Sequence, residues 1–138
     1  YTNSPYLISV SGVDASDVIY SWSNFGSDVD VSAPGCTGAT TYNTSSYGSF
    51  CGTSNAAPEV AGLLMLIFGA NSSLTPAQAE SILYNSSQDL GASGWDKYYG
   101  WGRINAEKAV MYARDNNIGP ILTPPPSETK TKCKGKRC

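Results

Sequence analysis

The chain has 138 residues, of which 41% are hydrophobic and 14% charged, and it contains no histidine. This length corresponds to one domain or part of one. The abundance of Gly, Ser, Thr, Asn and Tyr is typical of a stable, turn-rich extracellular enzyme and argues against a disordered or nucleic-acid-binding chain. The longest apolar run, residues 60–68, is too short to cross a bilayer, so no membrane partner is expected.

Charge is distributed unevenly along the chain. Residues 1–120 hold four of the nine basic residues and ten of the eleven acidic ones, whereas the tail from residue 121 is basic. Pro120 and prolines 124–126 form a stiff spacer before this tail. We therefore expect an acidic folded part over residues 1–117 and a Pro-rich spacer with a basic tail over 118–138. Cys133 and Cys138 either close a small disulfide loop or begin a further module, and they lack the additional ligands that a metal site needs.

The first part of the chain is predicted to contribute strands. Residues 6–13 are mostly apolar and predict a buried strand of a parallel sheet, and residues 18–25 predict a second extended segment. Trp22 is expected in the core, because large aromatic residues mostly pack. Asp28 and Asp30 alternate with valines and so share one face of a strand. They are weak candidates for a structural Ca²⁺ site, with a solvated strand face as the alternative.

A β-hairpin is predicted between Cys36 and Cys51. Both halves of this segment are β-prone and its centre is rich in Asn, Ser and Thr. A hairpin brings its ends together, so the two cysteines either form a disulfide or remain as two buried thiols. We expect the disulfide, which would stabilise the fold by about 3 kcal/mol for a loop of this size.

The segment after this hairpin predicts a tight glycine turn that leads into a helix. Thr53 or Ser54 is the expected N-cap, Pro58 is expected in the first turn, and Glu59 suits the positive end of the helix. Residues 60–68 contain no polar side chain, so this helix is predicted to be apolar on all sides and buried.

Two more helices are predicted in the second half. Thr75 and Gln78 form a capping box at the start of one, and Asn105 caps the other. Residues 88–101 between them are predicted to be a loop rich in Gly and aromatic residues. The helix that starts at Thr75 is assigned a structural role.

Three motifs in this chain resemble the subtilisin-like serine proteases (subtilases). The first is Gly52-Thr53-Ser54-x-Ala56-x-Pro58-x-Val60-Ala61-Gly62, which resembles the serine motif of that family. The second is the run Ser21-Trp22-Ser23-Asn24-Phe25-Gly26 with Val29-Asp30-Val31-Ser32-Ala33-Pro34-Gly35, and the third is Tyr99-Gly100-Trp101-Gly102-Arg103-Ile104-Asn105-Ala106. The family commonly has Met at position 55 and His at position 59, where this chain has Asn55 and Glu59.

The resemblance implies an α/β fold: the C-terminal half of a subtilase catalytic domain, with a parallel sheet, a buried central helix and a hairpin before the serine. It implies that Ser54 is the nucleophile of a secreted serine endopeptidase, with Thr53 supporting the oxyanion hole, and that no cofactor is required. Some members hold a stabilising cation near the turn that carries Asp28 and Asp30.

The absence of histidine means that this chain cannot supply the general base. The catalytic Asp, His and oxyanion Asn are expected from the N-terminal half of the same domain, which is the expected partner besides protein or peptide substrates. Alone, the chain is expected to be inactive. The alternatives are a catalytically inactive module with a subtilase fold, used for binding or structure, and one chain of a nicked enzyme.

Overall fold

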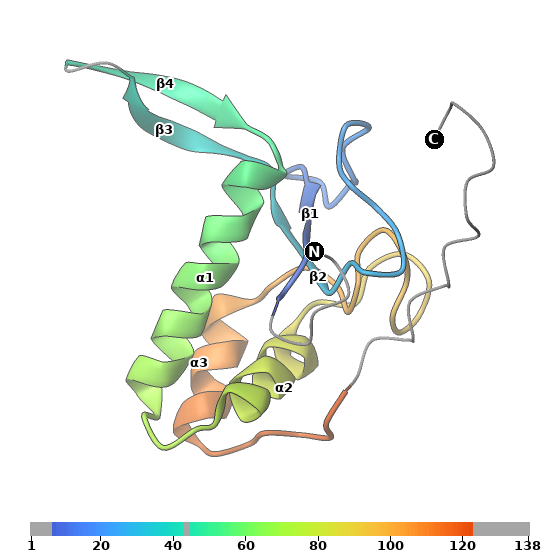
Figure 1. Cartoon of the computed structure of the whole chain (residues 1–138), viewed down its shortest axis with the longest axis vertical. Coiled ribbons are helices and arrows are strands. Elements are labelled where there is room, and N and C mark those ends of the chain that lie inside the picture. Colours follow the sequence, from blue (N-terminus) through green and yellow to red (C-terminus); the bar gives the residue numbers. More distant parts are fainter. Residues whose placement is uncertain (1–6, 43–44, 123–138) are drawn as a thin grey trace.

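The computed structural model of the chain describes residues 7–42 and 45–122, without the side chains of residues 37–42. Its elements follow the order β1 (Val10–Val13), β2 (Val31–Pro34), β3 (Cys36–Tyr42), β4 (Ser46–Cys51), α1 (Thr53–Ala70), α2 (Pro76–Ser86) and α3 (Ala106–Arg114). In Figure 1 the three helices gather on one side of strands β1 and β2, and the β3–β4 hairpin extends away from them at the start of α1. The fold is thus mixed α/β, as predicted.

Strands β1 and β2 form a parallel pair in which Val10 lies opposite Val31 and Val13 opposite Pro34. Val13, Val31 and Ala33 of this pair are buried, as expected for strands covered on their faces, whereas Val10 and Pro34 at its ends are half-buried. The predicted first strand is shorter than expected, because regular pairing begins only at Val10. Ser9 still contributes, since its carbonyl accepts hydrogen bonds from the N–H groups of Asp30 and Val31.

The prediction of an extended segment over residues 18–25 is wrong. This stretch consists mainly of turns and contains only an isolated bridge between Val13 and Ile19. The N–H of Ser23 donates to the carbonyl of Tyr20 at 2.9 Å, which closes a turn within this segment in place of a strand. Trp22 is also not a core residue: it is 45% exposed and stacks on the ring of Tyr20 at 4.4 Å between centroids.

The hydrophobic core lies between the parallel strands and the three helices. Strand β2 contributes Val31 and Ala33, and the helices contribute apolar side chains that are almost inaccessible to water: Ala56, Val60, Leu63, Ile67, Ala79, Ile82, Leu83, Ala109 and Ala113. Burial of such side chains is the main favourable term in folding. The core therefore holds one face of α1 against the sheet and against α3.

Helix α1 is buried on one face only, which differs from the prediction of a helix buried all round. Met65 is 76% exposed and Leu66 is 56% exposed, and Ala61, Gly62 and Gly69 are exposed as well. The described part of the chain supplies packing partners on one side of the helix alone. The apolar sequence predicted burial on every face, but burial also requires packing partners, and the described residues supply them for one face of α1.

Helices α2 and α3 begin as predicted. The Thr75 hydroxyl accepts from the N–H of Gln78, and the Gln78 side chain accepts from the N–H of Thr75, which completes the capping box. The Asn105 side chain accepts from the N–H of Lys108 at the start of α3. Each cap satisfies a backbone donor that the first helical turn leaves without a partner.

The loop between α2 and α3 runs beside β2, where it takes the place of a further strand. The N–H of Trp101 donates to the carbonyl of Asp30, the N–H of Ser32 donates to the carbonyl of Gly102, and the N–H of Ile104 donates to the carbonyl of Ser32. Gly100 has a positive φ of 62°, and a Cβ there would collide with the backbone of Asp30. Glycine permits both this conformation and this close approach.

The start of the predicted spacer contacts the folded part. The side-chain amide of Asn85 in α2 donates to the carbonyl of Pro120 at 2.8 Å, and Ile118 and Leu122 pack against the core. The remaining tail, with Cys133 and Cys138, lies outside the described residues. Across residues 7–42 and 45–122, no helix is long and apolar enough to span a membrane.

Candidate active site

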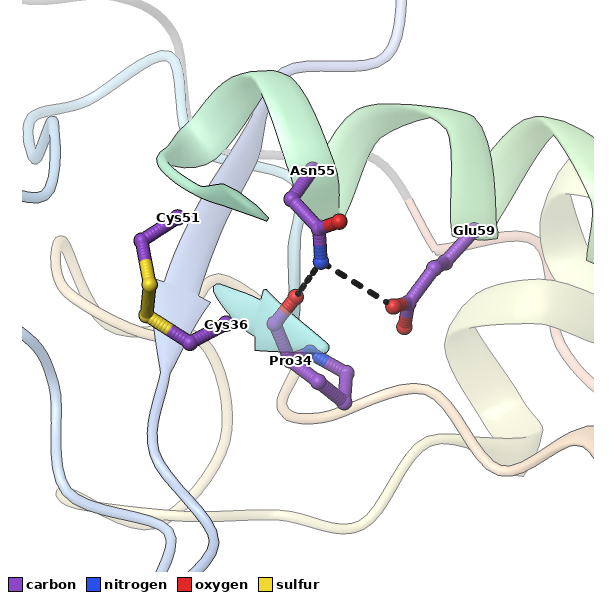
Figure 2. Close-up of a disulfide and its surroundings, with 5 residues drawn as sticks. All are labelled: Pro34, Cys36, Cys51, Asn55 and Glu59. Atoms are coloured by element: carbon purple, nitrogen blue, oxygen red, sulfur yellow. Dashed lines mark hydrogen bonds between the residues drawn. A yellow bond between two sulfur atoms is a disulfide. The ribbon is translucent and has the colours of Figure 1, made fainter. Parts of the chain in front are cut away.

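The predicted hairpin forms, and it ends directly before the candidate nucleophile. Strands β3 and β4 pair antiparallel with Cys36 opposite Cys51, and these two residues form the expected disulfide. The N–H of Gly52 then donates to the carbonyl of Gly35 at 2.8 Å. The disulfide in Figure 2 therefore lies at the point where β2 leads into the hairpin and the hairpin leads into α1.

The start of α1 differs in detail from the prediction. Gly52 is the N-cap residue, with φ of 148°, and no side chain caps the helix. Thr53 and Ser54 are already helical, so neither is the cap. Pro58 lies in the second turn of the helix, and Glu59 follows it, so the expected interaction of Glu59 with the helix N-terminus is wrong. Glycine occupies the cap position because the positive φ strains any residue with a Cβ.

Ser54 is exposed on the first turn of α1, one residue after half-buried Thr53. The N–H groups of a first helical turn have no acceptor four residues earlier, and they carry the positive end of the helix dipole. A negatively charged oxygen beside the Ser54 hydroxyl is therefore stabilised by backbone donors that are already in place. Such a position suits a side chain that attacks a carbonyl group.

Pro58 affects the backbone at Ser54 directly. Proline has no N–H, so it cannot form the usual helical hydrogen bond to the carbonyl four residues earlier, and here that carbonyl belongs to Ser54. The turn that carries the serine consequently has one fewer internal hydrogen bond than a regular helix. The position of this turn therefore depends more on contacts with other elements than it would in a regular helix.

One such contact is made by Asn55, the residue after Ser54. Its side-chain Nδ2 donates to the carbonyl of Pro34 at 3.2 Å and to Oε1 of Glu59 at 3.3 Å. Figure 2 shows the Asn55 amide lying between these two acceptors, one at the end of β2 and the other one turn further along α1. The two positions that depart from the usual family motif therefore interact with each other.

A second polar cluster lies where β2 meets α2. Asp30 is only 6% exposed, and its Oδ2 accepts from the N–H of Ser9 at 2.7 Å. The hydroxyl of Tyr84 lies against this carboxyl group and donates to Oε1 of Glu80 at 2.7 Å. Burial raises the pKa of Asp30 to about 6, the Ser9 N–H opposes this shift, and the charge of Glu80 adds to it. Burial and the bond to Glu80 hold the pKa of Tyr84 above its usual range.

The two candidate cation ligands have different surroundings. Asp30 is buried, so the interpretation of a solvated strand face is wrong for it, whereas Asp28 lies half-buried in the preceding turn. Within the described part of the chain, no three His, Cys, Asp or Glu residues cluster as metal ligands do. A Ca²⁺ site at this turn remains a prediction.

Sequence reasoning missed the contacts of Asn55 and the cluster around Asp30. Both join residues that are distant along the chain: 21 positions separate Asn55 from Pro34, and the same number separate Asp30 from Ser9. The spacing of Asn55 and Glu59, four residues apart in a predicted helix, was the one available signal. Nothing in the sequence indicated that Pro34 accepts from the same amide.

Comparison with known proteins matches most of the chain to one family. A profile of the subtilase family matches residues 2–102. Thermitase from Thermoactinomyces vulgaris is 40% identical over 105 residues, which cover 76% of this chain and 36% of thermitase. The extracellular protease of Xanthomonas campestris is 39% identical over 120 residues, covering 80% of this chain and 20% of that protein. Subtilisin E from Bacillus subtilis is 39% identical over 107 residues, covering 78% and 27% of the two chains. The chain thus spans well under half the length of these relatives.

Proposed function

Because the chain belongs to the subtilase family, we propose that it carries the nucleophile of a serine endopeptidase, and that this nucleophile is Ser54. One observation carries the proposal: an exposed serine hydroxyl on the first turn of an apolar helix, directly after a disulfide-closed hairpin. The residues around it lie inside the region that matches the family. The helix N-terminus supplies the electrostatic environment that acyl transfer requires.

In the proposed reaction, the Ser54 oxygen attacks the carbonyl carbon of the scissile peptide bond while a general base takes its proton. The carbonyl oxygen becomes an oxyanion, which the Ser54 N–H and the Thr53 hydroxyl help to stabilise. Collapse of this intermediate breaks the C–N bond, and the base returns the proton to the leaving amine. Water then hydrolyses the acyl-enzyme by the same steps in reverse, releasing the acid and the free serine.

We propose that the remaining part of the catalytic domain supplies three groups: the general base, its aspartate partner and a side-chain donor to the oxyanion. The chain contains no histidine, and the subtilase arrangement places Asp and His before Ser. We accordingly propose that the chain has no peptidase activity without that part. Secretion is proposed as well, on the basis of relatives described as extracellular proteases and of the disulfide.

An active-site-directed fluorophosphonate tests the proposal on the protease that contains this chain. The reagent should phosphonylate Ser54, as read by mass spectrometry of the chymotryptic peptide that contains this residue. Ser54→Ala should abolish labelling and lower kcat by roughly a millionfold, the loss known for the nucleophile of subtilisin. Ser49→Ala, which changes an exposed serine in β4, is the control and should leave the labelling stoichiometry unchanged.

The competing function is a binding or structural module that keeps the fold without the chemistry. It is favoured by the absence of histidine and by Asn55 and Glu59 at positions where the family commonly has Met and His. A folded parent protein that resists the fluorophosphonate and cleaves no peptide would support this module and count against the protease.

A further inference from the structure

We propose that Asn55 and Glu59 act as a positioning pair that fixes Ser54 relative to the end of β2. This inference rests on the proposed function of Ser54, because it concerns how that nucleophile is held. Neither side chain is proposed to touch the substrate. Both act through the backbone of the first turns of α1.

The first step in the argument is the chemistry of the two acceptors. The Pro34 carbonyl and the Glu59 carboxylate can only accept hydrogen bonds, so the group of Asn55 that faces both of them must be its NH₂ rather than its oxygen. The NH₂ group carries two hydrogens, so it can donate to both acceptors. The bond to Glu59 is charge-assisted, and it orients the amide so that the other hydrogen points to Pro34.

The second step is the placement of the contacts along the chain. Before Ser54, the N–H of Gly52 donates to the carbonyl of Gly35 at 2.8 Å. After Ser54, the Asn55 amide donates to the carbonyl of Pro34, the neighbour of Gly35. The serine thus lies between two attachments to consecutive carbonyls at the end of β2. Figure 2 shows the second of these attachments, from Asn55 to Pro34.

The third step is the local weakness that the pair compensates. Pro58 cannot donate to the Ser54 carbonyl, so the turn that holds the nucleophile is less constrained by its own helix. A displacement of a nucleophile by about 1 Å can cost around a hundredfold in rate. A side-chain attachment one residue away from Ser54 limits such displacement.

The fourth step explains why the pair consists of these two residues. Asn55 and Glu59 are four residues apart and are both half-buried on the same side of α1. Glu59 fixes the Asn55 amide from within the helix, and Pro34 holds the same amide from the sheet. Without Glu59, the Asn55 amide is no longer oriented toward Pro34. Asn55 and Glu59 should therefore behave as a unit when they are substituted.

The test compares variants of the whole protease by steady-state kinetics and by the rate of fluorophosphonate labelling. Asn55→Ala and Glu59→Ala should each lower kcat and the labelling rate about tenfold, with KM changed less than about twofold. Glu59→Gln retains the acceptor oxygen without the charge and should recover kcat to within about threefold of the parent. The double variant Asn55→Ala/Glu59→Ala should be no slower than Asn55→Ala alone.

The controls separate positioning from stability and from the proposed function itself. Each variant is measured below its own unfolding temperature, and Glu107→Ala, which changes an exposed glutamate in α3, should alter neither kcat nor KM. A kcat for Asn55→Ala or Glu59→Ala within about twofold of the parent overturns the pair. So does a loss of kcat that Glu59→Gln fails to recover. If the parent protease itself cleaves no peptide and takes up no label, the proposed function and the pair both fail.

Discussion

At the scale of single residues, Asp30 shows how tertiary contacts change the chemistry of a side chain. Its carboxyl group is buried against Ser9, Tyr84 and Glu80, which come from the approach to β1 and from α2. Burial favours the protonated form of Asp30 and raises its pKa from 3.8 to about 6. The Ser9 N–H and the Tyr84 hydroxyl oppose this shift, whereas the charge of Glu80 adds to it.

Asp30 should make the folded state less stable as the pH rises from about 4 to 6. A group whose pKa is higher in the folded state than in the unfolded state stabilises the fold while it is protonated and loses this contribution as it ionises. The shift corresponds to at most about 3 kcal/mol. Asp30→Asn, made with Ser54→Ala to prevent self-digestion, should flatten the fall in the apparent unfolding temperature over this pH range.

Glu107→Gln in the same background is the control for this measurement, because it removes a carboxyl group that is exposed on α3. It should leave the pH dependence as it is in the parent. An Asp30→Asn variant with the same pH profile as the parent would show that Asp30 ionises freely in the folded protein.

At the scale of elements, the hairpin and the start of α1 form one connected unit. The disulfide joins the first residue of β3 to the last residue of β4, and Gly52 connects directly to α1. In Figure 1 the hairpin extends away from the helices, and its base lies at the start of α1. The disulfide and the Gly52–Gly35 hydrogen bond connect the two ends of the hairpin at this base.

Removal of this disulfide should destabilise the protein and loosen the turn before Ser54. A link that closes a loop of this size contributes about 3 kcal/mol, mainly by restricting the unfolded chain. Cys36→Ser/Cys51→Ser should lower the apparent unfolding temperature. It should also make the hairpin sensitive to cleavage by an added protease such as thermolysin. The parent treated with a reductant should behave in the same way, whereas an unchanged unfolding temperature in both would contradict the prediction.

At the scale of the whole molecule, the outer face of α1 is apolar and open to solvent. Ala61, Gly62, Met65, Leu66 and Gly69 lie on it, and two of these are large apolar side chains. The parallel pair of β1 and β2 is too small to form a stable sheet by itself. The matched part of the chain covers 36% of thermitase and 27% of subtilisin E, so these relatives extend well beyond the part that it matches.

The chain expressed alone should therefore associate with itself or fail to fold. Contiguous exposed apolar surface and open strand edges both favour aggregation. Size-exclusion chromatography with light scattering should show large particles, and Met65→Lys/Leu66→Glu should reduce their size. In the complete protease, the same pair of substitutions should lower the yield of folded enzyme, while the exposed pair Ala92→Lys/Ser93→Glu should not. A stable, well-folded monomer of the isolated chain would contradict this prediction.

Features that depend on neighbours along the chain could be predicted from the order of the amino acids. The hairpin between Cys36 and Cys51, the capping box of Thr75 and Gln78 and the Asn105 cap were all predicted correctly. Each rests on local rules: turn residues, helix caps and the side-chain period. The serine motif likewise identified the family because its residues are contiguous.

Features that depend on contacts between distant segments could not be predicted in this way, and they became visible only in the folded chain. The local sequence predicted that residues 18–25 are extended and that Trp22 is buried. The structure instead has a turn closed by the Ser23–Tyr20 backbone hydrogen bond, and Trp22 is exposed and stacks on Tyr20. An apolar pattern predicted that α1 is buried, and the packing partners present left half of it open. The contacts of Asn55 with Pro34 and of Asp30 with Ser9 each cross 21 residues of chain. No local pattern encodes such pairs, because a hydrogen bond depends on distance in space, and that distance is set by how the sheet and helices pack together.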